Sequence, residues 1–333
     1  MEEKMKLLPY PEKPMFLCYH NKAFPFGVIE ANSSESITKW VCTKCVNCAY
    51  YPNSPRNKFN IVVGDVWGIR EGIITREVLQ IKKNHVELFK MDLLHILKTA
   101  IRSDCYVQGR YNEKYIPDKW AFNKEDYTHD FLIIGCDDDK FISVGYVADG
   151  RFKQFEIPNQ DLIDGLFSIT GEKINLNLLS YKVSAVPSPD TKRMIDDLKE
   201  YISTANNLDN PTPETNTFGI ASNMRLKDFF VDEVNKGETY IDRRYSRVLY
   251  EHKWVLAQLV DLFIDDENKK KYQECANRNL ERAKLVHMLG LKMGYTRNAN
   301  IINRVAELID QIIAEEVEYI PLLIDLLQTK YLN

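Results

Sequence analysis

A polar, turn-prone stretch at residues 203–217 divides the sequence into two parts with different patterns. Its composition, rich in Asn, Thr, Ser and Pro, favours a loop or linker. Before it, short β-branched and aromatic runs alternate with helical patterns, whereas after it apolar residues recur only at helical spacing. A chain of 333 residues is long enough for two cores. We therefore predict an α+β domain at 1–202, a linker or loop at 203–217 and a helical domain at 218–333.

The clearest β pattern lies in the N-terminal part, between residues 130 and 157. Three apolar runs at 130–135, 141–147 and 152–157 are separated by the turn-forming residues Cys136-Asp-Asp-Asp139 and Asp149-Gly150. This pattern predicts a three-stranded meander. The other predicted elements are a strand at 58–69, an amphipathic helix at 86–101 and an extended segment at 174–186.

Composition and charge exclude several classes of protein. Hydrophobic residues make up 44% and charged residues 28% of the chain, which is an ordinary globular balance. A net charge of -4 argues against a nucleic-acid or anionic-membrane partner. The longest apolar runs, near Phe131–Gly135 and Ile320–Leu327, are far shorter than the roughly 20 residues of a membrane helix. The first residues show no signal-peptide pattern, so we expect a cytoplasmic protein whose seven cysteines are thiols.

One cysteine and one histidine suit acyl-transfer chemistry. Such a site needs a thiolate, an imidazole that moves protons, and a group that orients the imidazole. Cys18 lies in a proline- and aromatic-rich entry segment, and His129 begins the first strand of the predicted meander. A cysteine near the N-terminus with a histidine at a strand start about a hundred residues later fits that geometry. Packing as a small hydrophobe is the alternative for a lone cysteine.

The residues around His129 carry a resemblance to a known family. The run His129-Asp-Phe-Leu-Ile-Ile-Gly-Cys-Asp-Asp-Asp139 resembles the histidine strand and hairpin of papain-like cysteine peptidases of the bacteriocin-processing kind. The preceding Arg110-Tyr-Asn-Glu-Lys-Tyr-Ile-Pro117 is similar to the corresponding segment in the N-terminal domain of the butirosin biosynthesis protein H family. The resemblance covers roughly residues 14–170. It implies a papain-like fold for this part of the chain, so the predicted fold class is α+β, papain-like, with the C-terminal helical domain that the apolar spacing after residue 217 indicates.

The resemblance assigns the two main catalytic roles. Cys18 would be the nucleophile and His129 the base. Papain-like cysteines begin a long central helix, and here Pro25 and Gly27 are expected to interrupt a helix that starts at Cys18.

The third catalytic group is less defined by the sequence. It should lie on the strand paired with the histidine strand, and counting through the hairpin leads to Gly145, with Asp149 just beyond. Asp149 is therefore the candidate for orienting His129, although ordinary turn chemistry also accounts for it. Asn112 and Asp118 are alternatives, and so is a Cys–His dyad with no third member.

The remaining candidates concern substrate and metal. Asn21, close to Cys18, and Asn112 and Tyr115, in the segment that resembles the family, are the candidates for substrate binding. Local turn hydrogen bonding is the alternative for Asn21. The spacing Cys42-x-x-Cys45-x-x-Cys48 is compatible with thiolate ligation of a metal, but a fourth ligand is missing. We therefore predict no metal and expect these thiols to share one helical face and pack.

The resemblance implies a cysteine-dependent acyltransferase of antibiotic (nonribosomal peptide type) biosynthesis, including pathways to polythioamides. The acyl donor would be carried on the phosphopantetheine of an acyl or peptidyl carrier protein, and a small amine would accept the acyl group as an amide. No other cofactor is expected, and the helical domain would serve carrier docking or cover the acyl pocket. Two alternatives remain, a cysteine peptidase or amidase of the same fold and a non-catalytic binding protein.

Overall fold

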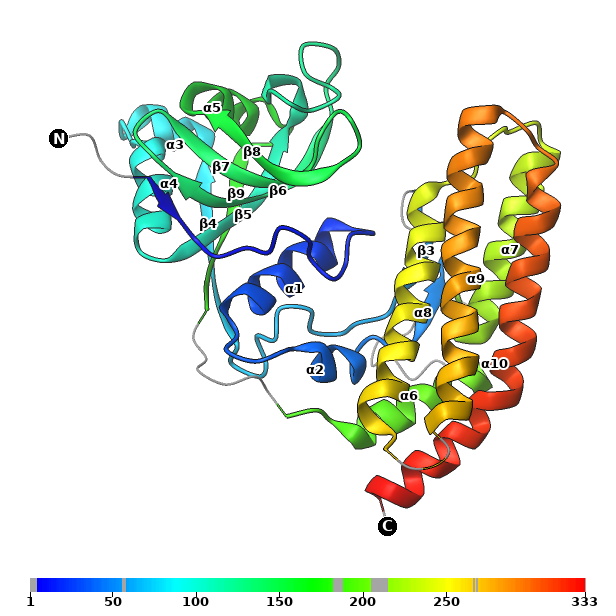
Figure 1. Ribbon diagram of the computed structural model, residues 1–333. Coiled ribbons are helices and arrows are strands. Elements are labelled where there is room, and N and C mark those ends of the chain that lie inside the picture. The colour runs from blue at the N-terminus through cyan, green and yellow to red at the C-terminus, as the bar shows by residue number, and fades with distance from the viewer. Residues whose placement is uncertain are drawn as a thin grey trace. The chain divides into compact units, whose positions relative to one another are not determined.

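The protein forms two compact units in a computed structural model that describes residues 5–55, 58–181, 188–204, 215–265, 267 and 269–332 (Figure 1). The N-terminal unit consists of residues up to Glu35 together with Asp65–Val186. The helical unit consists of Ser36–Gly64 together with the chain from Pro187 onward. The polypeptide therefore passes through the helical unit once before it completes the N-terminal unit.

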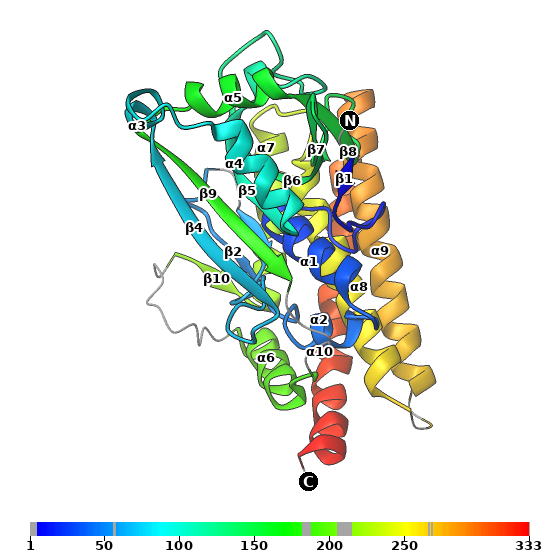
Figure 2. The ribbon, with the colours of Figure 1, turned by 90° about the vertical axis from the view of Figure 1, so that its left-hand side faces the viewer.

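A seven-stranded antiparallel sheet forms the centre of the N-terminal unit. Its order is β4-β9-β5-β6-β7-β8, and β1 pairs with one end of β6. Figure 2 shows β4 and β9 as long neighbouring strands, in agreement with their nine paired residues. The strands are β1 (Lys6–Leu7), β4 (Ile74–Lys82), β5 (Cys105–Asn112), β6 (Thr128–Cys136), β7 (Lys140–Tyr146), β8 (Phe152–Pro158) and β9 (Lys173–Tyr181).

The predicted meander is confirmed as β6, β7 and β8. Strand β6 is buried from Phe131 to Cys136, because its two faces are both covered. The turn to β7 is held by Asp137, whose Oδ1 accepts hydrogen bonds from the backbone amides of Asp139 and Lys140 at 2.9 Å each. The predicted extended segment at 174–186 corresponds to β9 over Lys173–Tyr181.

Short helices cover this sheet. They are α1 (His20–Asn32), α3 (Lys83–Leu88), α4 (Leu93–Arg102), the 3₁₀ turn η1 (Glu113–Tyr115) and α5 (Asn159–Ser168). Helices α4 and α5 contact β5, whereas α1 contacts β6 and β9. The helix predicted at 86–101 is in fact two, since Asp92 accepts a hydrogen bond from the His95 amide and caps a new helix there.

The helical unit combines long helices with a small sheet. Its strands, in the order β10-β2-β3, are β2 (Cys48–Tyr50), β3 (Phe59–Ile61) and β10 (Thr217–Phe218). Its helices are α2 (Thr38–Cys42), α6 (Thr191–Ser203), α7 (Ile220–Asn235), α8 (Arg243–Phe263), α9 (Lys269–Thr296) and α10 (Ile301–Tyr331). Helix α9 contacts both α8 and α10, and α10 also contacts α6 and α7.

The unit boundaries differ from the predicted 1–202, 203–217 and 218–333. Helix α6 belongs to the helical unit, and so does the segment Ser36–Gly64, which the sequence analysis placed in the N-terminal domain. The reason is strand pairing, because Ala49 of β2 lies opposite Phe218 of β10. The strand predicted at 58–69 is only the three-residue β3. Most of the predicted linker, residues 205–214, lies outside the described residues.

The coarse prediction of an α+β protein is confirmed by these two units. Among the described helices, none combines the length and the apolar composition needed to cross a membrane.

Candidate functional site

His129 and Glu113 form the central contact of the candidate site. His129 Nδ1 lies 2.8 Å from Glu113 Oε1. In the β5–β6 ladder Tyr111 is opposite His129 and Asn112 is opposite Thr128. Side chains of opposite residues share a face of the sheet, and so do residues two apart on one strand. Glu113, two residues beyond Tyr111, therefore lies diagonally across from His129 and within reach of its ring.

This contact defines which imidazole nitrogen is basic. A carboxylate only accepts hydrogen bonds, so His129 donates from Nδ1 and its Nε2 carries the lone pair. The side chain of Glu113 is only 4% exposed, whereas that of His129 is 33% exposed. The pair thus combines a buried, fixed acid with an imidazole that solvent and substrate can reach, which is the arrangement of a general base and its orienting group.

The residues on both sides of Cys18 contact the elements that carry this pair. Cys18 is buried and precedes Tyr19, the N-cap of α1. On one side of it, the Leu17 carbonyl accepts a hydrogen bond from the Tyr146 hydroxyl at 2.6 Å. On the other side, the His20 ring centre lies 4.6 Å from that of His129. The strands that carry the site thus contact the residues on both sides of Cys18.

Helix α1 is longer than the sequence predicted. It runs from His20 to Asn32 through both Pro25 and Gly27, so the expected interruption is wrong. Pro25 has no backbone N–H, so this buried helix lacks one backbone hydrogen bond there but continues. At Gly27, an added Cβ would lie 2.5 Å from the Tyr10 ring, whose hydroxyl donates to the Ala23 carbonyl at 2.8 Å. Gly27 therefore admits the Tyr10 ring against the helix.

The start of α1 is electrostatically suited to a thiolate. The first turn of the helix contains no acidic residue. The positive end of a helix dipole stabilises an anion placed there, and helix N-termini are a common setting for reactive cysteines. Cys18 lies at this end of α1.

His20 is a buried imidazole stacked on the site. Its ring lies between those of Phe24, at 4.5 Å, and His129, at 4.6 Å, measured between ring centres. Neither ring nitrogen makes a hydrogen bond with a described residue. Burial, followed by the charges of His129 and Lys119, lowers the pKa of His20 well below its usual value, and the nearby Asp130 backbone only partly opposes this. His20 is therefore an uncharged packing partner of His129.

Lys119 completes what we call the His129 cluster, which comprises His20, Glu113, Lys119 and His129. Its ammonium donates to the Tyr146 carbonyl at 2.6 Å and lies 3.9 Å from Glu113 Oε1. The Lys119 side chain is only 2% exposed. Burial lowers its pKa to about 8, although Glu113 and Asp118 act in the opposite direction.

Asp149 does not orient His129. Its carboxylate accepts hydrogen bonds from the Arg151 backbone amide at 2.9 Å and from the Arg151 guanidinium at 2.7 Å, and this pairing lowers the pKa of Asp149. The Asp149 side chain is 43% exposed in the turn that follows β7. The carboxylate that contacts His129 is instead that of Glu113, which directly follows β5, the other neighbour of the histidine strand.

The other predicted residues have different surroundings. Asn112 is buried, and its amide nitrogen donates to Asp126 at 2.8 Å while its oxygen accepts from the Lys114 and Tyr127 amides. Asn112 therefore holds the turn that carries Glu113, rather than facing a substrate. Asn21 is exposed on α1, and Tyr115 is half-buried in η1.

Glu113 and Lys119 were not predicted from the sequence. Glu113 lies within the segment Arg110–Pro117 that carried the resemblance, two residues after Tyr111. Pairing the strand at 105–112 with the strand at 128–136 would have been the signal for it. No sequence pattern marks Lys119 as buried.

Cys42, Cys45 and Cys48 do not share a helical face. Cys42 ends α2, Cys48 begins β2 and Cys45 lies in the turn between them. Burial raises the pKa of both Cys42 and Cys48, that of Cys48 to about 11, and the Cys48 thiol is 3.0 Å from Ser222 Oγ. Within the described ranges, no group of three or more Cys, His, Asp or Glu side chains is arranged to hold a metal ion.

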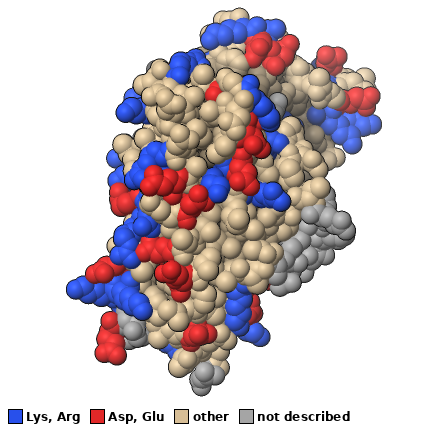
Figure 3. Space-filling view, turned by 90° about the vertical axis from the view of Figure 1, so that its right-hand side faces the viewer, with Lys and Arg blue, Asp and Glu red and all other residues tan. Residues whose placement is uncertain are grey.

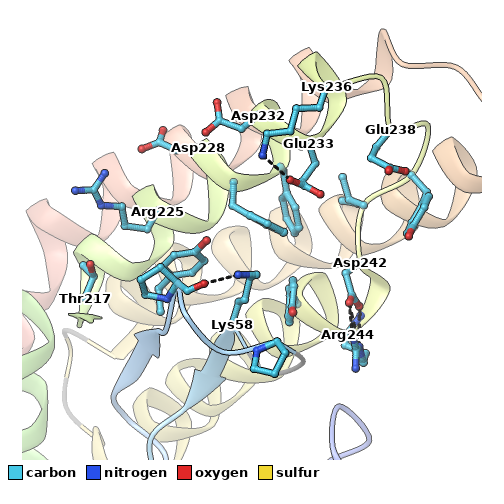
Figure 4. Close-up of a pocket in the computed structure, with 18 of the residues that line it drawn as sticks. Lys58, Thr217, Arg225, Asp228, Asp232, Glu233, Lys236, Glu238, Asp242 and Arg244 are labelled. Carbon is cyan, nitrogen blue, oxygen red and sulfur yellow. Dashed lines mark hydrogen bonds and ion pairs between the residues drawn. The ribbon is translucent and has the colours of Figure 1, made fainter. Parts of the chain in front are cut away.

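The helical unit contains a pocket of about 760 Å³ between α7, the start of α8 and the β2–β3 connection (Figure 4). Several of its charges pair within the pocket. Lys236 contacts Glu233, Arg244 contacts Asp242, and Lys58 donates to the Pro52 carbonyl. On the molecular face in Figure 3, basic and acidic side chains are interspersed. Neither the pocket nor this surface brings together side chains that suit a defined reaction.

Comparison with models of known protein families found no match, and a search of curated proteins found none either.

Proposed function

We propose that the protein is a papain-like cysteine acyltransferase that moves an acyl group from a carrier-protein thioester to an amine. The observation that supports it best is the His129–Glu113 contact near the start of β6, where His129 also stacks on His20 at the start of α1, two residues after Cys18. Glu113 supplies the orienting group that the sequence left open. A nucleophile, a base and an orienting acid are the parts this chemistry needs.

In the first step, the Cys18 thiolate attacks the carbonyl carbon of the pantetheine thioester. The carbonyl electron pair moves onto oxygen and then returns, and the carbon–sulfur bond to pantetheine breaks. His129, protonated by the original Cys18 thiol, gives that proton to the departing pantetheine thiolate. The acyl group is then held on Cys18 as a thioester, so little free energy separates reactants from products.

In the second step, the amine attacks the acyl–Cys18 carbonyl. His129 Nε2 removes a proton from the amine nitrogen, while Glu113 stabilises the imidazolium through the Nδ1 hydrogen bond. The carbon–sulfur bond breaks, the amide leaves, and Cys18 returns as a thiolate beside protonated His129. Amide formation from a thioester is downhill and drives the sequence.

The proposal requires a carrier protein and an amine, and no resident cofactor. We further propose that the pathway is antibiotic biosynthesis in the cytoplasm, on the resemblance of residues 14–170. A hydrolytic peptidase or amidase would use the same residues with water in place of the amine. A binding protein without activity would not require a buried acid fixed on an accessible histidine.

The test is to mix the protein with an acyl-loaded carrier protein and follow its intact mass. We expect one acyl mass on Cys18, discharged as an amide when an amine is added. Cys18→Ala should abolish the adduct, and His129→Ala should slow its formation by roughly 100-fold. Water discharging the acyl group as fast as any amine would support the hydrolase. A protein that never gains acyl mass would refute acyl transfer.

A simpler measurement tests the thiol itself. A thiol next to an imidazole reacts as its thiolate, so Cys18 should react with iodoacetamide at pH 7 faster than Cys275, whose pKa is raised mainly by burial. Equal labelling of the two residues would contradict the assignment of Cys18.

A further inference from the structure

Lys119 is a buried cation that the proposed reaction does not use. It follows η1 at the end of the loop that carries Glu113, and its ammonium rests 4.3 Å from the centre of the Phe155 ring. Burying an ammonium costs free energy that an apolar side chain of similar size would avoid. Its presence next to a candidate acid therefore calls for a reason other than packing.

The contacts of Lys119 join the two strands on either side of His129. Its hydrogen bond at 2.6 Å goes to the carbonyl of Tyr146, the last residue of β7. Its ion pair at 3.9 Å goes to Glu113, which directly follows β5. Strand β6, which carries His129, pairs with both.

The same oxygen of Glu113 faces both partners. Oε1 accepts from His129 Nδ1 at 2.8 Å and is also the Glu113 oxygen that lies 3.9 Å from the Lys119 ammonium. An ammonium there favours the ionised carboxylate, which is the form that accepts from Nδ1. We infer that Lys119 is a positioning residue of the candidate site, whose ammonium holds the ionised Glu113 carboxylate against His129.

The position of Lys119 also gives it an electrostatic effect on the site. A positive charge disfavours protonation of every group nearby, and Lys119 already lowers the pKa of His20 in this way. The charged groups around Lys119 are Glu113 and Asp118, with His20 beside it. Without this charge, the groups of the site should be protonated more easily. As the pH is lowered, Cys18 should therefore lose its reactivity at a higher pH than in the wild type. Because the pKa of the ammonium is lowered to about 8, its charge is lost near that pH. The pH profile of Cys18 reactivity should therefore show a second step near pH 8.

The experiment measures the alkylation rate of Cys18 by iodoacetamide from pH 5 to 10 in the full chain. In Lys119→Met, we expect the midpoint of the acid limb to rise by about 0.5 to 1 pH unit. Lys119→Arg keeps the charge at all these pH values, so its acid limb should match the wild type while the step near pH 8 disappears. The matched control is Lys114→Met, which removes a half-exposed lysine 3.6 Å from Asp126 and should not move the midpoint.

A purely structural role would lower the rate at every pH without moving the midpoint, and that result for Lys119→Met would overturn the inference. If Lys119→Met does not fold, the Lys119→Arg profile decides alone, because an acid limb that moves although the positive charge is kept contradicts the inference. The inference rests on Cys18 and His129 as proposed above, but not on the acyl donor. Failure to gain acyl mass would therefore refute acyl transfer and leave the test of Lys119 standing, whereas an unreactive Cys18 would refute both.

Discussion

Each unit buries a lysine, a glutamate and a histidine together, but only the N-terminal set reaches solvent. In the helical unit, the Lys253 cluster comprises Tyr201, His252, Lys253 and Glu316, all less than 2% exposed. The Lys253 ammonium lies 2.8 and 2.9 Å from the two Glu316 oxygens and 3.0 Å from the Tyr201 hydroxyl. In the His129 cluster, by contrast, the closest approach of lysine to carboxylate is 3.9 Å.

The histidines show the difference most clearly. His252 has Nε2 at 2.6 Å from the Val46 carbonyl and Nδ1 at 3.1 Å from Lys253, so both nitrogens are occupied. Among the described residues, His129 has a hydrogen-bond partner at Nδ1 alone, which is Glu113, and its side chain is one-third exposed. A fully buried polar cluster whose histidine is paired at both nitrogens contributes to a unique packing, whereas one with a partly exposed histidine is equipped for chemistry.

The largest expected effect is the loss of stability when the Lys253 cluster is broken. Glu316→Gln leaves the Lys253 ammonium buried without its carboxylate, so we expect it to lower the free energy of unfolding by about 3 to 5 kcal/mol. The double variant Lys253→Met/Glu316→Leu removes both charges and should lower the free energy of unfolding much less than Glu316→Gln does. Urea unfolding followed by circular dichroism measures both, and a cost below about 1 kcal/mol for Glu316→Gln would show that the cluster is not closed.

A smaller effect, on rate instead of stability, is expected in the His129 cluster. Glu113→Gln removes the orienting charge and should slow acylation of Cys18 roughly 10-fold or more, because the amide no longer fixes the basic tautomer of His129. Asp149→Asn is the matched control, and its rate of Cys18 acylation should stay within about twofold of the wild-type rate. An equal loss of rate in the two variants would show that Asp149 contributes to the site as much as Glu113 does. Intact-mass kinetics provides both rates.

The smallest effect compares the two buried histidines. His252→Phe leaves the Val46 carbonyl without its histidine partner and removes one acceptor from Lys253, which keeps Glu316 and Tyr201. This variant should lower the free energy of unfolding by about 1 to 3 kcal/mol. His20→Phe keeps an aromatic ring next to Phe24 and His129, and His20 makes no side-chain hydrogen bond with a described residue that would be lost. The free energy of unfolding of this variant should therefore stay within about 1 kcal/mol of the wild type. Chemical unfolding of the two variants tests this, and a larger cost for His20→Phe would reverse the comparison.

Local patterns explain what could be predicted from the sequence. The meander from Phe131 to Pro158 follows from apolar runs separated by Asp-rich turns, and both signals lie within a few residues of the elements they define. His129 became a candidate for the same reason, since it lies at the start of this meander, whereas the role of Cys18 rests on the resemblance and stays a prediction. The helical character of the C-terminal part was also visible from local patterns.

The errors come from pairing between distant segments. Asp149 was found by counting through the β6–β7 hairpin, whereas Glu113 follows from the pairing of β5 with β6 across a long connection. The domain boundary failed because β2 pairs with β10, about 170 residues later in the chain. Burial of Lys119 depends on the position of Tyr146 and Glu113 together, which no periodicity in the sequence reports.

The crossing of the chain between units has a consequence for biosynthesis. The segment Ser36–Gly64 contains Trp40, Val41 and Phe59, which are fully buried in the finished helical unit. Helix α8, against which α2 and β3 pack, begins about 180 residues later at Arg243. At ordinary translation rates, this apolar segment waits on the order of 10 to 40 s for its partners, after the rest of the N-terminal unit has already been synthesised. A product that ends before α8 therefore leaves the apolar residues of α2 and β3 without the helix that covers them, and so prone to aggregation and proteolysis.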